Sequence, residues 1–188
     1  VVRINFSGKK ITKNQFDTTW LNEVFSIGHR NPQGLIINPE DNTVWSHEHG
    51  PQGGDEINLL EGGENYGWPK VTHGEEYGGG KIGKLTQKGF KDPKWIWVPS
   101  IAPSGMAFYN GNMFPELNDH LLIGSLKFKQ IHAIKILNGH PVLERKLLNK
   151  SYGRVRDLEV MNDGSILFIT DEDKSGRYKG GLYKIFKK

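Results

Sequence analysis

Three segments of this chain repeat one pattern: a short apolar run, a turn rich in Asn, Asp or Gly, and a second apolar run. The repeated segments cover residues 32–46, 103–125 and 156–170. Short apolar runs on either side of such a turn are typical of β-hairpins. Another strand-like run follows each hairpin, at residues 56–60, 130–136 and 181–186. Each repeat therefore predicts three or four strands, and the chain is predicted to be all-β.

Units of three or four strands are typical of the blades of a β-propeller. At roughly 40–50 residues per blade, the chain holds about three to four blades. Their spacing is uneven because residues 62–98 form a long insertion between strands. We expect a single, partial propeller domain over residues 1–188. Since a propeller ring must close, we also expect the chain to be part of a larger ring.

Composition excludes several classes of protein. The net charge is +4, but the basic residues form no dense run of the kind that binds nucleic acid. No apolar run approaches the ~20 residues of a membrane-spanning helix. The chain has no Cys, so it has neither disulfides nor thiolate metal ligands. Its positive charge suits either a solvated surface or a site for an anionic ligand.

The positions of the loops within each repeat bring positively charged residues together. In a blade, the first strand runs along the central channel and the second returns, so the loop before the first and the loop after the second share one face. These loops carry four cations, Arg30, Lys127, Arg154 and Arg156. Such a cluster predicts a polycarboxylate or phosphate ligand. Because Arg154 and Arg156 alternate along a strand, both point the same way, toward this ligand or toward a salt bridge with Asp157 or Asp171.

Six short motifs follow one another along the chain. They are 28–35 (GHRNPQGL), 48–58 (EHGPQGGDEIN), 65–69 (NYGWP), 99–105 (PSIAPSG), 124–127 (GSLK) and 154–157 (RVRD). This ordered set resembles the C-terminal half of the soluble pyrroloquinoline quinone (PQQ)-dependent aldose sugar and glucose dehydrogenases. The resemblance implies a six-bladed β-propeller quinoprotein, periplasmic or secreted, that oxidises aldose sugars at C1 to lactones. It also implies PQQ and Ca²⁺ as cofactors and an electron acceptor as partner.

The resemblance assigns roles to particular residues. Arg30 and Asn31 would contact the quinone and carboxylate side of PQQ, and Arg30 would stabilise charge on the quinone oxygens. A second set would also bind PQQ, namely His49, Lys127, Arg154 and Arg156. The backbone carbonyls of Gly50 and Pro51 would bind a Ca²⁺ that touches PQQ, because carbonyl oxygens suit a hard cation. Glu56 and the backbone of Tyr66 match positions that hold a second, structural Ca²⁺.

One functional group of the family is absent from this sequence. In the family, a His base removes the proton of the anomeric hydroxyl while hydride passes from sugar C1 to PQQ C5. That His lies upstream of the motif at 28–35, and none of the first 28 residues is His. We therefore expect a missing N-terminal half to supply the base. His29 belongs to the motif and is a poor substitute.

Several residues have a second interpretation. His49 suits turn capping as well as packing on the cofactor ring, and Trp68 suits a structural role. Asp55 and Glu56 are adjacent on a strand and face opposite ways, so they are poor partners in acid–base catalysis. We expect Asp55 to pin a loop and Glu56 to bind metal.

Two other functions remain open from the sequence. Without the base, the chain is also compatible with a non-catalytic propeller that binds sugar or protein partners. A calcium-dependent phosphotriesterase-like propeller would need carboxylates and Asn around the channel, where this chain has Arg and Lys.

Overall fold

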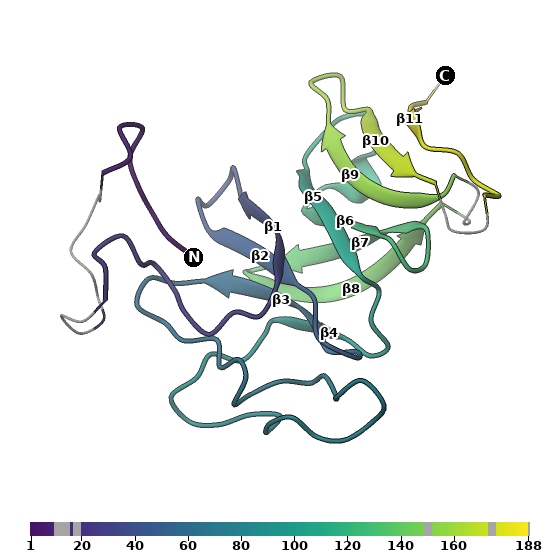
Figure 1. Ribbon diagram of the computed structural model, residues 1–188. Helices are drawn as coiled ribbons and strands as arrows, with labels where there is room; N and C mark the ends of the chain where they lie inside the picture. The colour runs from purple at the N-terminus through teal and green to yellow at the C-terminus, as the bar shows by residue number, and fades with distance from the viewer. Residues whose placement is uncertain (10–15, 17–19, 149–151, 173–175, 188) are drawn as a thin grey trace.

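The computed structural model describes residues 1–9, 16, 20–148, 152–172 and 176–187. Within these residues, the chain forms three antiparallel sheets with the strand orders β1-β2-β3-β4, β5-β6-β7-β8 and β11-β10-β9 (Figure 1). The strands are β1 (Pro32–Ile37), β2 (Val44–Glu48), β3 (Asp55–Leu60), β4 (Trp95–Trp97), β5 (Pro103–Tyr109), β6 (His120–Ser125), β7 (Gln130–Leu137), β8 (His140–Leu147), β9 (Arg154–Val160), β10 (Ile166–Asp171) and β11 (Gly181–Ile185). A single 3₁₀ turn, Pro115–Leu117, is the only helical element among them. The all-β prediction is therefore confirmed.

Each sheet is a meander in which successive strands pair with their neighbours along the chain. The three repeated hairpins correspond to β1-β2, β5-β6 and β9-β10. The third turn is built around Gly164, whose φ of +80° is a conformation that residues with a side chain rarely adopt. Asp163 caps the same turn by accepting a hydrogen bond from the Ser165 amide at 2.9 Å. Turn chemistry therefore sets the register of this hairpin.

Two strands lie where the sequence predicted none. β4 falls inside the predicted insertion at 62–98 and pairs with β3, so the first sheet has a fourth strand. β8 has no regular apolar alternation, and most of its side chains are exposed. It forms because the tight turn at Asn138 and Gly139, both with positive φ, returns the chain along β7. Backbone pairing, rather than burial of side chains, specifies β8, whereas β4 also buries Trp97 in the core.

The hydrophobic core lies between the sheets rather than within any one of them. On β6, Leu121 and Leu122 are both fully buried. Because successive side chains of a strand face opposite ways, Leu121 packs in the core shared with the first sheet and Leu122 in the core shared with the third. The second sheet is therefore covered on both faces, and burial of its apolar side chains holds the three sheets together.

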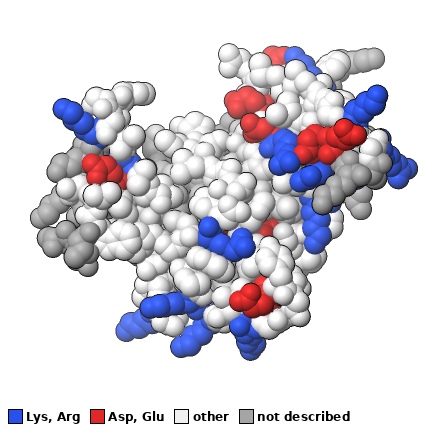
Figure 2. Space-filling model, in the orientation of Figure 1, with Lys and Arg blue, Asp and Glu red and all other residues white. Residues whose placement is uncertain are grey.

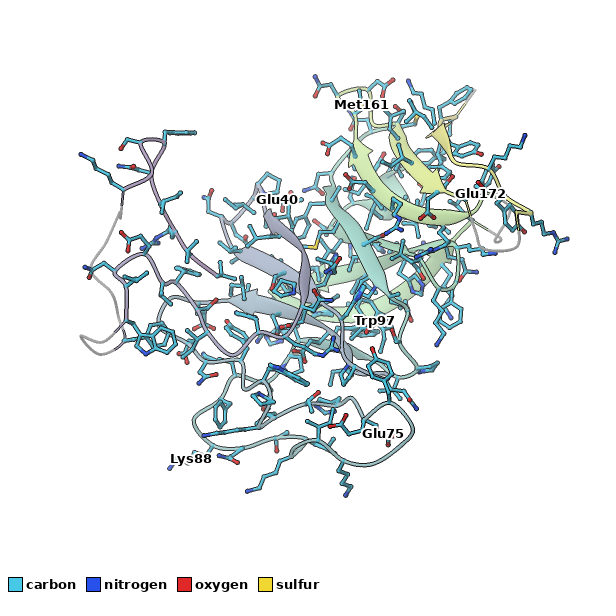
Figure 3. All side chains as sticks on the ribbon, viewed as in Figure 1. Glu40, Glu75, Lys88, Trp97, Met161 and Glu172 are labelled. Atoms are coloured by element: carbon cyan, nitrogen blue, oxygen red, sulfur yellow. The ribbon has the colours of Figure 1, made fainter. Side chains whose placement is uncertain are left out.

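Polar bonds join the same sheets. Trp97 of β4 donates its indole N–H to Glu144 of β8 at 2.9 Å, near the centre of the view in Figure 3. Ser104 of β5 donates to the Val155 carbonyl of β9 at 2.7 Å. These bonds satisfy buried groups that would otherwise lose their hydrogen bonds to water, so they favour one relative placement of the sheets.

Apolar side chains are exposed at both ends of the array. Leu35 and Ile37 of β1 are about half exposed, and so is Ile169 of β10. Leu182 of β11 is 69% exposed. Figure 1 shows the first and third sheets on either side of the second. Among the described residues, no helix has the length and apolar character needed to cross a membrane.

Tyr109 offers a test of the packing between the second and third sheets. Its buried hydroxyl donates to the Gly164 carbonyl at 2.7 Å and accepts the Phe114 amide at 2.9 Å. We expect Tyr109→Phe to lower the free energy of unfolding by about 1–3 kcal/mol, because two buried groups lose their partner. Urea titration measures the change. Tyr77→Phe, at a side chain that is 74% exposed, is the control; equal stability of both variants would contradict this role.

Candidate functional site

The loops predicted to carry the site lie at one edge of the three sheets. Cross-strand pairing places Pro32 opposite Glu48 in the first sheet and Pro103 opposite Ser125 in the second. In the third sheet, Arg154 is opposite Asp171. Each pair joins the start of a hairpin's first strand to the end of its second. The edge so defined, here called the loop edge, carries all the predicted cofactor residues: Arg30, Asn31, His49, Lys127, Arg154 and Arg156.

Arg30 is held by the loop that follows β2. Its Nη1 donates to the carbonyl oxygens of His49 at 3.0 Å and Gly50 at 3.2 Å. The guanidinium also lies 5.3 Å from the ring centroid of Trp68, a cation–π contact. The predicted structural role of Trp68 is therefore to support Arg30. Arg30 is only partly buried, which leaves part of it accessible to a ligand.

Glu48 organises the backbone before β1. This carboxylate is 2% exposed. Its Oε2 accepts the amides of Arg30 at 2.5 Å and Asn31 at 3.1 Å. Its Oε1 lies 3.1 Å from His29 Nδ1. The loop that carries two predicted PQQ contacts is thus fixed by a buried charge at the end of β2.

His29 is enclosed rather than presented to the loop edge. Its Nε2 lies 2.8 Å from Ser26 Oγ, and its ring stacks on Tyr66 with 4.8 Å between ring centroids. The side chain is 7% exposed, and Ser26 is 1% exposed. Ser26, His29 and Glu48 are bonded in the order of a catalytic triad, but a buried Ser cannot reach a substrate. His29 is therefore a structural residue of the motif.

Asp55 pins two loops at once, as predicted. Its Oδ1 accepts the Gly50 amide at 3.0 Å. Its Oδ2 accepts the Ser100 hydroxyl at 2.6 Å and the Ile101 and Ala102 amides at 2.8 Å each. The loop after β2 and the loop before β5 are consequently held together by one fully buried carboxylate.

We expect Asp55→Ala to lower the free energy of unfolding by about 3 kcal/mol or more, because it removes the acceptor of four hydrogen bonds and only the Ala102 amide keeps another acceptor, Ser100 Oγ. Thermal or urea unfolding of the purified variant measures the loss. Asp92→Ala, an exposed carboxylate in the insertion, should leave stability within about 0.5 kcal/mol of the parent. Similar stabilities for the two variants would show that Asp55 does not pin these loops.

Glu56, the predicted metal ligand, lies beside a second carboxylate. It pairs across the strands with Glu48, and Asn58 Nδ2 donates to its Oε1 at 3.4 Å. Burial, and then repulsion from the Glu48 carboxylate, raise the pKa of Glu56 to about 8. In the part of the chain that the structure describes, no side-chain cation forms an ion pair with Glu56. A bound cation would lower this pKa and restore the charged form.

The second predicted calcium ligand lies in the same neighbourhood. Tyr66 stacks on His29, which is bonded to Glu48, and its hydroxyl donates to the Leu59 carbonyl of β3 at 2.7 Å. Among the described residues, no group of three or more His, Asp or Glu side chains is arranged to hold a metal ion. A site of the predicted type does not require one, because carbonyl oxygens supply most of its ligands.

At the third sheet, the two arginines share one carboxylate. Arg156 Nη2 lies 2.6 Å and Arg154 Nε 3.7 Å from the carboxylate oxygens of Asp171. The predicted salt bridge to Asp171 is therefore formed, and both side chains do point the same way. Acidic and basic side chains lie side by side over this sheet (Figure 2). In the second sheet, Lys127 is exposed and forms no ion pair with a described carboxylate.

His49 and His47 differ in their settings at the end of β2. The Nε2 of His49 lies 2.6 Å from the Pro103 carbonyl, so its ring joins the first two sheets at the loop edge. This bond links two sheets and is not the predicted turn cap, and cofactor contact stays a prediction. His47 is fully buried and lies against Gly34, where a Cβ atom would come within 2.5 Å of the ring. Only glycine therefore fits at position 34 of the motif.

Burial, and then the neighbouring His49, lower the pKa of His47 to about 3. The unfolded chain protonates this ring near pH 6.5, whereas the folded chain keeps it neutral, so stability is complete above pH 6.5 and falls as pH decreases toward 3. Between pH 7 and pH 5 this group alone should remove about 2 kcal/mol. We expect His47→Gln to flatten the dependence of unfolding free energy on pH over that range. The same slope in both proteins would contradict a neutral His47.

The sequence reasoning missed Glu48 and Asn58 as parts of the site. Asn58 Nδ2 donates to Glu48 Oε1 at 3.2 Å, and both side chains are buried. The sequence held one indication of this cluster, because Glu48 and Glu56 flank the short connection between β2 and β3. Their pairing across the strands depends on register, which the sequence alone does not define.

Comparison with known proteins agrees with this geometry. The fold is of the β-propeller type, and its loop edge gathers cations. The Glucose / Sorbosone dehydrogenase family model matches residues 1–183. The chain belongs to this family of sugar-oxidising enzymes.

Three relatives illustrate the match. Aldose sugar dehydrogenase YliI of Escherichia coli (strain K12) is 44% identical over 154 residues, which are 80% of this chain and 41% of the relative. A crystal structure of glucose dehydrogenase superposes with a TM-score of 0.91 at 36% identity, over 100% of this chain and 54% of that one. The PQQ-bound form of aldose sugar dehydrogenase from Streptomyces coelicolor gives 0.74 at 25% identity, over 97% and 50%. The chain thus spans about half the length of the relatives it matches.

Proposed function

We propose that this chain is the PQQ- and calcium-binding part of a PQQ-dependent aldose dehydrogenase with a six-bladed propeller. The observation that carries the proposal is the loop edge, where cations lie beside all three sheets while the carboxylates of Glu48 and Asp55 are already engaged by backbone amides. Asp171 is shared by two arginines, and Lys127 has no ion-pair partner among the described residues. The PQQ-bound relative gives the class of ligand that fits, a small molecule with several carboxylates.

Each residue at the loop edge has a task in this proposal. Lys127, Arg154 and Arg156 would bind carboxylates of PQQ as charge-assisted hydrogen-bond donors. Arg30 and Asn31 would orient the quinone side, and the fixed guanidinium would stabilise negative charge that grows there during the reaction. When bound, PQQ supplies the chemistry of hydride acceptance from the sugar carbon.

Calcium fits the same edge for an electrostatic reason. The carbonyls of Gly50 and Pro51 would hold one Ca²⁺, and the Gly50 carbonyl already accepts Arg30. Arg30 and a Ca²⁺ near the same carbonyl would repel each other, and a carboxylate of the bound cofactor would offset this repulsion. Glu56 and the Tyr66 carbonyl would hold the structural Ca²⁺, since a buried carboxyl with a raised pKa gains a counter-ion there.

The whole reaction requires parts that this chain does not contain. His29 is enclosed and His49 is bonded to Pro103, so the base that takes the anomeric proton would come from the remaining part of the propeller. The same part would complete the sugar pocket. The electron acceptor and a periplasmic or secreted location also belong to this proposal. The chain alone, as a binding module without catalysis, is the second candidate function, and the missing base favours it.

The test is a titration of the purified chain with PQQ in the presence of Ca²⁺, followed by absorbance, and then addition of glucose with a reducible dye. We expect saturable binding that Lys127→Ala and Arg156→Ala each weaken by about tenfold or more, because each removes a charge-assisted bond. Lys88→Ala is the matched control, because Lys88 is an exposed lysine of the insertion (Figure 3).

The outcomes separate the two functions. Binding with dye reduction would mean that this chain is catalytically complete, and would contradict an external base. Binding without reduction supports the binding part of an enzyme whose base is elsewhere. A folded chain that binds no PQQ would reject the cofactor assignment.

A further inference from the structure

Glu48 connects the rigid first sheet to the loop proposed to bind PQQ. Both loop amides, those of Arg30 and Asn31, are directed at one oxygen atom, Oε2. Two consecutive amides that share an acceptor restrict the backbone direction at that point, since turning either one away removes a hydrogen bond from a buried carboxylate. The carboxylate therefore fixes the position from which the Arg30 side chain starts.

The acceptor itself is fixed by the sheet. Glu48 is the last residue of β2, and its other oxygen, Oε1, accepts a hydrogen bond from Asn58 of β3 at 3.2 Å. The same oxygen lies 3.1 Å from His29 Nδ1. With both oxygens engaged and 2% of the residue exposed, Glu48 has no freedom to turn toward a ligand.

The side chain of Arg30 depends on this arrangement. Its guanidinium reaches the carbonyls of His49 and Gly50, the two residues that directly follow Glu48. One strand end thus supplies both the acceptor for the Arg30 backbone and the acceptors for its side chain. A shift of the backbone would break both sets of bonds and move the guanidinium relative to the rest of the loop edge.

We propose that Glu48 is a positioning residue for PQQ binding, which sets the backbone of Arg30 and Asn31 without touching the cofactor. This inference rests on the proposed function of the loop edge. It differs from a general stabilising role, because it requires the two hydrogen bonds to Oε2 and does not require the negative charge.

Two substitutions of Glu48 distinguish the effect of its hydrogen bonds from the effect of its negative charge. Glu48→Gln keeps one carbonyl oxygen, which can occupy the Oε2 position and accept both amides. It removes the charge, and it replaces the Oε1 acceptor of Asn58 with an NH2 donor. Glu48→Ala removes both acceptors. The positioning role predicts that Gln preserves PQQ affinity and Ala does not.

The experiment measures the Kd for PQQ by absorbance titration at saturating Ca²⁺, together with thermal unfolding of every variant. We expect Glu48→Ala to raise Kd about tenfold or more and Glu48→Gln to stay within about threefold of the parent. The matched control is Asp163→Ala, which removes the acceptor for the Ser165 amide and for Lys184 at the end of the third sheet opposite the loop edge. It should lower stability and leave Kd unchanged.

Two results would overturn the inference: a parental Kd for Glu48→Ala, or a Kd for Glu48→Gln as weak as that of Ala. Hydrogen exchange of the Arg30 and Asn31 amides gives a readout that needs no cofactor. Faster exchange in Glu48→Ala, with Glu48→Gln near the parent, supports the inference; equal exchange in all three proteins rejects it. Absence of PQQ binding by the parent would reject the proposed function, and amide exchange would still decide the role of Glu48.

Discussion

Buried carboxylates at the ends of two adjacent strands order the loop edge of this protein. Glu48 and Asp55 lie out of water and Glu56 is partly buried, and a charge in such a place must find donors or a cation. Glu48 and Asp55 find backbone amides, and so each fixes a loop against the sheet. Glu56 finds no comparable set, and its pKa is raised accordingly. Loops without regular structure thus gain a defined shape from the sheet beneath them.

The sheets supply the rigidity that these bonds require. Apolar side chains buried on both faces of the second sheet hold the three sheets together. Apolar packing alone tolerates small shifts of one sheet relative to another. Polar bonds between the sheets, such as that from His49 to the Pro103 carbonyl, supply this specificity at the loop edge. Arg30, Lys127 and Arg156 come from three different sheets, so their relative placement depends on packing as much as on local structure.

Much of the fold followed from residue pattern. The hairpins were predictable because their turns contain Gly, Asn and Asp between short apolar runs, and the Asp163–Gly164 turn shows the reason in its φ angle and capping bond. β4 and β8 were not predictable. One has three residues and the other has mostly exposed side chains, so neither leaves the periodic signal that burial creates. The family resemblance located the loop-edge residues, and geometry added Glu48 and Asn58.

By itself, the sequence determined the class of fold, the family and the cations that meet at the loop edge, since turn chemistry and strand phase are local properties of the chain. Only the tertiary structure decided how those residues are held. It paired Glu48 with Glu56 across β2 and β3, and it directed the Arg30 guanidinium at two carbonyl oxygens. It also buried His29 and placed Arg154 and Arg156 in ion pairs with Asp171. These outcomes depend on strand register and on the burial of charge, which arise when segments distant in sequence pack together.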